Sequence, residues 1–236
     1  MIPVNAIVEF LQSAGVFLLG LLVRFLGLVL VVAAYAIPIL VIYGLYLAFK
    51  WMRERQLGFR EIGGLTLVEA RHYAPGHTWL ARRLGGQLRV GLDDLAQHLL
   101  PGTTFVKLPC PGSRVEAGSP VATIACGDRI ARIPAPVTGT VTAINAAVVK
   151  DPDLVHSSPY GRGWLFAVKP AGQTYRTLPT GAGARIWFRQ EEGRLSRFIE
   201  GELGLAAADG GELVFPAPAL LPPEKWQALI GSFLRA

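Results

Sequence analysis

The stretch "ATIACGDRIARIPAPVTGTV", residues 122–141, decides the fold of this chain. Apolar and polar residues alternate on either side of "CGDR", and such alternation predicts two half-buried strands. In Cys126-Gly127-Asp128-Arg129 the glycine takes the first central turn position, which suits a type II′ turn. We therefore expect a tight β-hairpin with Gly127 and Asp128 at its tip.

Short β-rich runs separated by Gly and Pro surround this hairpin. They are "GQLRVGL" (86–92), "TTFVKLP" (103–109), "GTVTAIN" (139–145) and "GWLFAVKP" (163–170). Residues 93–99 predict the one helix among them, with an Asp at its start and Pro101-Gly102 after its end. This pattern predicts a compact, mainly β unit, either a sandwich or a flattened barrel.

Four segments carry a family resemblance in their order and spacing. They are "HTWL" (77–80), "VGLDDLAQHLLPGTTFVKLPCPGSRVEAGSPVATI" (90–124), "PAPVTGTVTAIN" (134–145) and "DPDLVHSSPYGRGWLFAVKP" (151–170). From about residue 73 to 172 the chain resembles the H protein of the glycine cleavage system. The resemblance implies a lipoyl/biotinyl-like barrel-sandwich hybrid of two short antiparallel sheets related by a pseudo-twofold.

In that family a lysine at a hairpin tip carries lipoate, which ferries an aminomethyl group between enzymes. Counting back from Ala135-Pro136 places the lysine position at Asp128, with Ala125 where the related biotinyl pattern has a glutamate. An acyl amide needs a primary amine, which neither Asp128 nor Arg129 supplies. The lysines of the chain lie elsewhere, at positions 50, 107, 150, 169 and 225. We therefore expect no lipoyl cofactor at this site.

Other reactive side chains give weak signals. Cys126 with Arg129 nearby and Cys110 as a resolving thiol would make a substitute carrier, but a small strand-end residue explains Cys126 as well. His77 and Trp79 match the family's H-x-W pattern, which we interpret as packing under the sheet.

No metal site is expected, because the remaining histidines, His72, His98 and His156, are isolated in the sequence. No H-E-x-x-H, G-x-S-x-G or P-loop motif occurs. We predict no catalytic, cofactor-binding or metal-binding residue, and no enzyme activity.

The first 50 residues have the composition of a membrane anchor. Between residues 15 and 49 the only charged residue is Arg24. At about 1.5 Å per residue, a helix over residues 25–49 reaches roughly 37 Å, enough to cross a bilayer core of about 30 Å. A cleaved signal peptide is the alternative, but the apolar run is too long, the first fourteen residues carry no Lys or Arg, and no A-x-A-like site follows.

Charge asymmetry predicts the orientation of this anchor. Lys50, Arg53, Arg55 and Arg60 follow the span closely, so the positive-inside rule places the C-terminal part in the cytoplasm. We expect a single-pass protein of the inner (cytoplasmic) membrane. Arg24 either snorkels to the outer interface or pairs with an acidic group of a partner subunit.

Residues 51–72 are predicted as a juxtamembrane linker, and residues 173–236 as a small α+β extension beyond the resemblance. In the extension, "ARIWFRQ" (184–190) and "GGELVF" (210–215) predict strands, and "GRLSRFIEGELG" (193–204) predicts a helix ended by Gly204. A terminal amphipathic helix over residues 223–234 has a stripe of Trp226, Leu229, Ile230 and Phe233. That stripe either packs on its own domain or binds a partner.

These features predict a function in assembly. The net charge is +6, but the basic residues are scattered with no Lys/Arg run, so no nucleic-acid partner is expected. We expect a non-catalytic accessory or scaffold subunit that stabilises or caps a larger membrane complex. An electron-transfer complex is one candidate host. We expect contacts with other subunits of the complex through the transmembrane helix and the C-terminal extension, and we expect the lipid bilayer as a further partner. The alternatives are a thiol-based or otherwise modified carrier and a membrane-fusion-type adaptor of a transport system.

Overall fold

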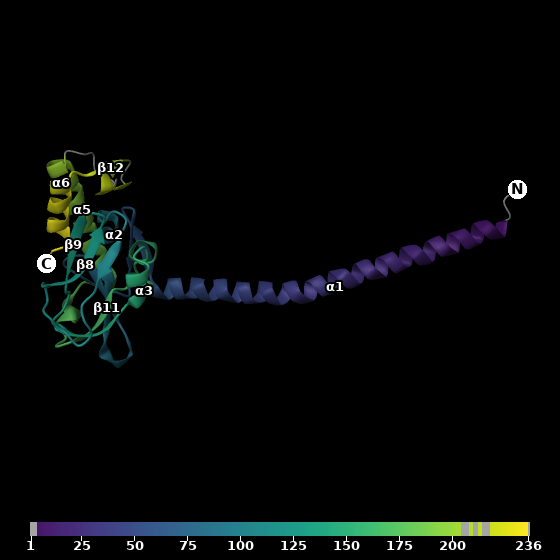
Figure 1. The fold of residues 1–236 in the computed structure, drawn as a ribbon, viewed down its shortest axis with the longest axis horizontal. Coiled ribbons are helices and arrows are strands. Elements are labelled where there is room, and N and C mark those ends of the chain that lie inside the picture. Colours follow the sequence, from purple (N-terminus) through teal and green to yellow (C-terminus); the bar gives the residue numbers. More distant parts are fainter. Residues whose placement is uncertain (1–3, 204–207, 210–211, 214–217, 236) are drawn as a thin grey trace. The chain divides into compact units, whose positions relative to one another are not determined.

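The computed structural model describes residues 4–203, 208–209, 212–213 and 218–235 (Figure 1). For residues 4–12, 50–51, 53–57, 203, 208–209 and 212–213 it describes the backbone only. The chain divides into two compact units, Met1–Gln56 and Leu57–Ala236, and each is described by itself.

The first unit is a single helix, α1 (Val4–Leu57), which is continuous through Pro38. Within its segment Ser13–Phe49, an 18-residue stretch has a mean hydropathy of 2.8, and none of that stretch is buried in the protein. Length and composition make this segment able to cross a membrane. A helix suits that environment because it satisfies its own backbone hydrogen bonds. The apolar segment begins earlier than the predicted span of residues 25–49.

The second unit is built on two antiparallel sheets, which confirms the predicted mainly β fold class with its N-terminal helix. The larger sheet has the order β3-β4-β5-β11-β10-β7, and the smaller one has the order β6-β8-β9. The strands of the larger sheet are β3 (His72–Ala74), β4 (Thr78–Arg82), β5 (Leu88–Leu92), β11 (Phe166–Pro170), β10 (Gly139–Ile144) and β7 (Arg114–Val115). Those of the smaller sheet are β6 (Phe105–Lys107), β8 (Pro120–Cys126) and β9 (Arg129–Pro134).

Side-chain alternation places the core between these sheets. Ile124 of β8 and Ile133 of β9 are fully buried, whereas Arg132 is exposed. In the larger sheet the indole of Trp79 covers Gly91, where an added Cβ would lie 2.5 Å from the ring atom Cζ2. The expected packing role of Trp79 is therefore seen directly.

Residues 51–72 do not form the predicted linker. Helix α1 continues to Leu57, and a hairpin of β1 (Phe59–Ile62) and β2 (Leu65–Val68) follows. Leu65 and Leu67 are fully buried. The short run "LTLV" buries its apolar side chains in the same core as the later strands, so residues 57–72 belong to the folded unit.

Short helices connect the strands. Helix α2 (Asp94–Leu99) begins where predicted, because the Asp93 carboxylate accepts a hydrogen bond from the N–H of Ala96. The other connections are α3 (Ala146–Lys150), α4 (Leu154–Ser157), and the 3₁₀ turns η1 (Leu84–Gly86) and η2 (Thr174–Thr177).

The strand predicted over residues 184–190 is wrong, because these residues lie in helix α5 (Gly181–Phe198). The alternation of Ala184, Ile186 and Phe188 suggested a strand, yet Ile186 is 59% exposed. Ala184, Phe188 and Leu195 are instead fully buried at helical spacing. The period of 3.6 residues, not the period of 2, defines the buried face.

The region after α5 is described in part. The predicted helix over residues 193–204 is divided between α5 and the π-helical turn η3 (Ile199–Leu203), and Gly204 lies outside the described residues. Of the strand predicted over residues 210–215, Glu212–Leu213 form β13, which pairs with β12 (Ala208–Asp209). Its other residues lie outside the described part.

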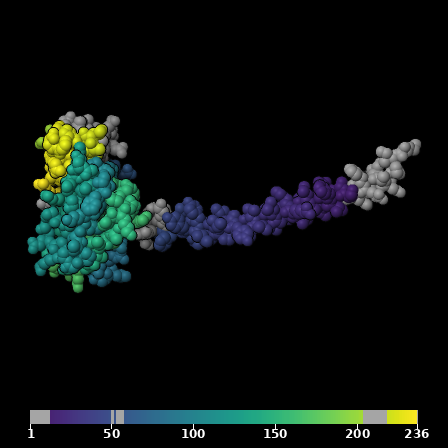
Figure 2. Space-filling view, in the orientation of Figure 1, coloured from purple at the N-terminus to yellow at the C-terminus, as the bar shows by residue number. Residues whose placement is uncertain are grey.

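The chain ends in the turn η4 (Pro218–Leu220) and helix α6 (Pro223–Phe233). The four side chains of the expected stripe, Trp226, Leu229, Ile230 and Phe233, are all buried. In Figure 2 the yellow surface of α6 lies directly beside the teal surface of the β-rich core. Of the two alternatives, the structure therefore has this stripe packed on the helix's own unit.

Candidate functional site

The β8–β9 hairpin tip is formed as predicted. Cys126 pairs with Arg129, and Gly127-Asp128 make the two-residue turn. Gly127 has a φ of 66°, while Asp128 is not among the described residues with a positive φ, the pattern of a type II′ turn. Asp128 is exposed. The outermost side chain of the tip is thus a carboxylate facing solvent.

Arg129, the residue directly after the turn, is held by the C-terminal segment. Its guanidinium donates two hydrogen bonds of 2.6 Å, to the carbonyls of Pro218 and Leu221. The same group lies 5.6 Å from the ring centroid of Trp226. We call this set of contacts the Arg129 clamp.

Trp226 fixes the other end of the clamp. Its side chain is fully buried, and its indole N–H donates a 3.1 Å hydrogen bond to the carbonyl of Leu99 at the end of α2. A buried indole with a satisfied N–H adds both apolar area and direction to a contact. Helix α6 is therefore docked against α2 and the hairpin at once.

The two cysteines do not make a reactive pair. Cys126 is buried, and burial raises the pKa of its thiol to about 11, outweighing the opposing effects of Thr103 and Arg129. A substitute carrier thiol would need a lowered pKa. The hypothesis that Cys126 is such a thiol is therefore wrong. Cys110 is exposed, and no disulfide joins it to Cys126.

His77 has a role beyond the packing that the sequence predicts. Its ring is 1% exposed, with Nδ1 2.9 Å from a carboxylate oxygen of Asp93 and Nε2 3.3 Å from one of Glu191. Burial alone would lower the pKa of His77, but attraction and hydrogen bonding to Asp93, joined by Glu191, raise it to about 9. A buried imidazolium therefore lies between two carboxylates.

This network connects separate parts of the unit. Asp93 caps α2, while Glu191 on α5 also accepts a 2.9 Å hydrogen bond from Nε of Arg194. Arg194 in turn lies over the ring of Phe233 of α6, 4.3 Å from its centroid. Burial works to raise the pKa of Glu191, but His77 and Arg194 hold it below its usual range. The network joins α2, α5 and α6 around one charged centre, which indicates a structural role.

The other three histidines each contact a different group. His72 Nδ1 is 3.5 Å from the carbonyl of Leu178, and His156 Nε2 is 2.8 Å from the Thr103 hydroxyl. His98 lies on α2. Within the part of the chain that the structure describes, no group of three or more His, Cys, Asp or Glu side chains is placed to hold a metal ion.

Tyr160 is a second residue whose role the sequence missed. The Tyr160 hydroxyl donates a hydrogen bond to the carbonyl of Thr66 at 2.8 Å. It also accepts a hydrogen bond from the N–H of Asp94 at 3.1 Å. Burial raises its pKa well above the usual 10, so the hydroxyl stays protonated. It joins β2 to the start of α2.

Comparison with known proteins agrees with this fold. The family model described as "Glycine cleavage H-protein" matches residues 71–181. The glycine cleavage system H protein of Mycobacterium avium (strain 104) is 40% identical over 98 residues, which cover 42% of this chain and 74% of the relative. The chain belongs to the glycine cleavage H-protein family. The H protein of Cronobacter sakazakii is 39% identical over 101 residues, covering 43% of this chain and 78% of that protein.

A solved structure also aligns with the chain. The crystal structure of a glycine cleavage system H protein from Mycobacterium marinum has 29% sequence identity and a TM-score of 0.46, covering 52% of this chain and 99% of the other. The H-protein family match ends at residue 181. The clamp therefore connects Arg129, inside the matched region, to Pro218, Leu221 and Trp226 outside it.

Proposed function

We propose that this member of the H-protein family is a membrane-anchored accessory subunit that works without a lipoyl group. In this proposal α1 holds the protein in the inner membrane as a single pass. The folded unit, from Leu57 onward, lies on the cytoplasmic face and stabilises or caps a larger membrane protein complex. The protein is not itself a catalyst.

The observation that carries the proposal is the chemistry of the hairpin tip. The tip consists of Gly127 and an exposed Asp128, and the guanidinium of Arg129 is held by two carbonyls. None of these groups is an amine that forms an amide with lipoate. The resemblance to the H protein places the attachment lysine at Asp128, so the carrier reaction lacks its acceptor.

The anchor and the orientation are supported by charge and hydropathy. The Ser13–Phe49 segment is long and apolar enough to cross a membrane. Basic residues cluster after it, at Lys50, Arg53, Arg55 and Arg60, which favours a cytoplasmic location for the folded unit. An electron-transfer complex stays one candidate host.

Both alternative functions have observations against them. A thiol carrier at Cys126 would need an accessible thiolate, whereas burial raises the pKa of that thiol to about 11. A membrane-fusion-type adaptor inserts a long helical hairpin between the two halves of its lipoyl fold. Here Gly127-Asp128 alone join β8 to β9.

The proposal is tested by purification of the full chain from its native membrane. A C-terminal affinity tag, a mild detergent and size-exclusion chromatography are used, followed by intact mass spectrometry. We expect co-elution with other integral membrane proteins in fixed ratio and a mass equal to that of the unmodified chain. The control replaces residues 13–49 with an unrelated apolar span, which separates partner contacts of α1 from membrane targeting.

Two results would overturn the proposal. One is a mass increase that matches a lipoyl amide. The other is a chain that elutes as an isolated monomer after crosslinking in intact membranes. Protease added to sealed inverted vesicles checks the orientation, and we expect it to digest the folded unit while α1 stays protected.

A further inference from the structure

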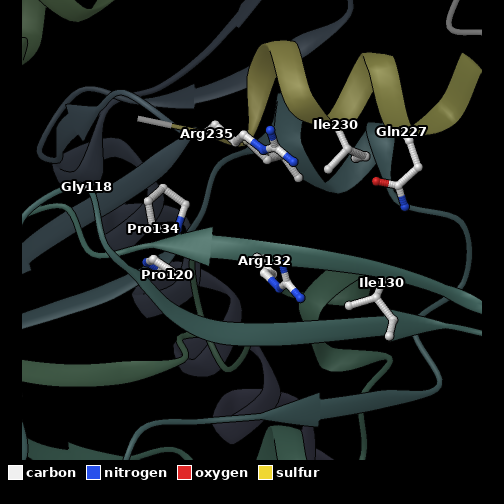
Figure 3. A pocket seen from close by; sticks show the side chains of 9 residues that line it. Gly118, Pro120, Ile130, Arg132, Pro134, Gln227, Ile230 and Arg235 are labelled. Atoms are coloured by element: carbon white, nitrogen blue, oxygen red, sulfur yellow. The ribbon is translucent and has the colours of Figure 1, made fainter. Parts of the chain in front are cut away.

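A groove runs between strand β9 and helix α6 (Figure 3). Its volume is about 420 Å³, and its lining includes Ile130 and Arg132 from β9 and Gln227, Ile230 and Leu234 from the helical side. Figure 3 shows Gln227 and Ile230 extending from α6 toward the strand. One wall is thus a strand and the other a helix.

The strand wall has an unpaired edge. Within the described part of the chain, β9 pairs with β8 alone. A two-residue turn makes Cys126 and Arg129 a hydrogen-bonded pair, so pairing alternates and Ala131 is the next such residue on β9. The backbone N–H and C=O groups of Ile130 and Arg132 therefore point away from β8, toward the groove. Such an edge is a template for a further strand.

The groove is also cationic. Arg132 and Arg235 both line it, both are exposed, and neither guanidinium has a hydrogen bond or an ion pair with a described residue. A second hollow of about 370 Å³ shares Arg132 with the groove and adds Lys107. Lys107 and Arg132 face each other across β8, because each pairs with Thr123. Positive charge therefore follows one line across this face.

Apolar surface accompanies the charge. Ile130 on the strand is 52% exposed, and Phe105 on β6 is 53% exposed in the same row, since both pair with Ala125. A strand added to an edge makes backbone hydrogen bonds, and its alternate side chains enter pockets that give specificity. The groove supplies the edge, apolar contacts and two guanidinium groups that match carboxylates in bidentate geometry.

We propose that an extended, acidic peptide segment of a partner protein binds in this groove as an added strand beside β9, with carboxylates on Arg132 and Arg235. The inference deepens the proposed function, on which it rests, by assigning a docking surface to the accessory subunit. A concave groove between a strand edge and a helix fits a chain of about one strand's width. A flat anionic bilayer would contact the guanidinium groups without entering it.

The test uses the purified full chain in neutral detergent micelles. Random decapeptides displayed on phage are selected against it, and the selected consensus is synthesised for fluorescence anisotropy. We expect enrichment of Asp and Glu at alternate positions. The variant Arg132→Gln/Arg235→Gln should weaken binding of the consensus peptide at least about tenfold, as expected for loss of two charge-assisted contacts.

Two controls separate charge and backbone effects. Arg189→Gln removes a charge from an exposed arginine of α5 and should change the affinity by less than about twofold. A consensus peptide N-methylated at alternate residues keeps its carboxylates but loses donors on one edge. One of the two methylation registers should lose binding, as a peptide paired with β9 requires.

Three outcomes would overturn the inference. In the first outcome, the selected peptides would not be acidic. In the second, the double variant would bind them as well as the native chain does. In the third outcome, the protein would bind only vesicles rich in phosphatidylserine through Arg132 and Arg235. That result would assign the surface to the membrane. Peptide binding in a protein that purifies without partners would contradict the accessory function alone, so the two proposals fail separately.

Discussion

The guanidinium of Arg129 lies 5.6 Å from the ring centroid of Trp226 and joins the β8–β9 tip to the last helix of the chain. The two residues are far apart in sequence, and Trp226 lies outside the family match to residues 71–181. The C-terminal extension therefore contacts a hairpin tip that lies inside the matched region.

Replacing Arg129 by Ala should loosen α6. The change removes two charge-assisted hydrogen bonds to Pro218 and Leu221, so the free energy of unfolding should fall by about 1–3 kcal/mol. Urea unfolding followed by Trp fluorescence measures it, with hydrogen exchange at α6 as a local readout. Arg132→Ala is the matched control and should change stability by less than about 0.5 kcal/mol. Equal effects of the two variants would contradict the clamp.

The buried ion pairs of His77 predict a pH dependence of stability. The pKa of His77 is raised from 6.5 to about 9 in the folded protein, so the folded state keeps a proton that the unfolded state loses. This stabilisation is complete below pH 6.5 and disappears as the pH rises from about 6.5 to about 9. Urea midpoints across that window should fall accordingly.

His77→Asn tests the origin of that dependence. Asn tolerates the positive φ of 54° at this position but carries no charge. It leaves Asp93 and Glu191 without their buried cation, so stability at pH 6 should fall by about 3–5 kcal/mol. The variant should also lose the slope between pH 6.5 and 9, whereas His72→Asn should keep it. A native slope in His77→Asn would show that another group titrates.

Cys126 should be unreactive in the folded protein. With a pKa of about 11, its thiol is ionised to roughly one part in a thousand at pH 8, and its side chain is buried. Maleimide should label Cys110 first, and Cys126 at least about a hundredfold more slowly until denaturant is added. The Cys110→Ser variant isolates the slow reaction. Rapid labelling of Cys126 in that variant would support the alternative function, a thiol-based carrier.

The tip should tolerate a lysine. Asp128 is exposed, so Asp128→Lys should change the free energy of unfolding by less than about 0.5 kcal/mol. Gly127→Ala is the contrasting variant, because φ is 66° there and a Cβ costs about 1–2 kcal/mol in that conformation. Differential scanning calorimetry of both variants compares the positions. A large loss in Asp128→Lys would mean that the carboxylate supports the fold.

Local patterns predicted much of the fold. Alternation and turn glycines indicate the β8–β9 hairpin, and Asp93 marks the start of α2, because each depends on residues close in sequence. The first part of helix α5 was predicted as a strand because "ARIWFRQ" also alternates, and the buried stripe of the helix is recognised only once Phe188 and Leu195 have a core to face.

The candidate site was harder to predict, because its contacts join residues that are far apart in the sequence. The tip residues Gly127 and Asp128 are recognised from the turn pattern, whereas the partners of Arg129 lie in or beside η4 and α6. The contact of His77 with Glu191 likewise joins the turn between β3 and β4 to helix α5. No local pattern pairs such residues, so their roles appear only when tertiary packing brings them together.

A swinging arm is useful when its root is free to pivot between distant reaction centres. In this protein Arg129, the residue that follows the exposed hairpin tip, is tied to the rest of the unit by two short hydrogen bonds and an aromatic ring. These contacts make the hairpin tip rigid and limit how far it can move. A lysine introduced at position 128 would thus provide a primary amine on a hairpin whose neighbouring residue is held in place, so its movement would come from the bonds of its own side chain.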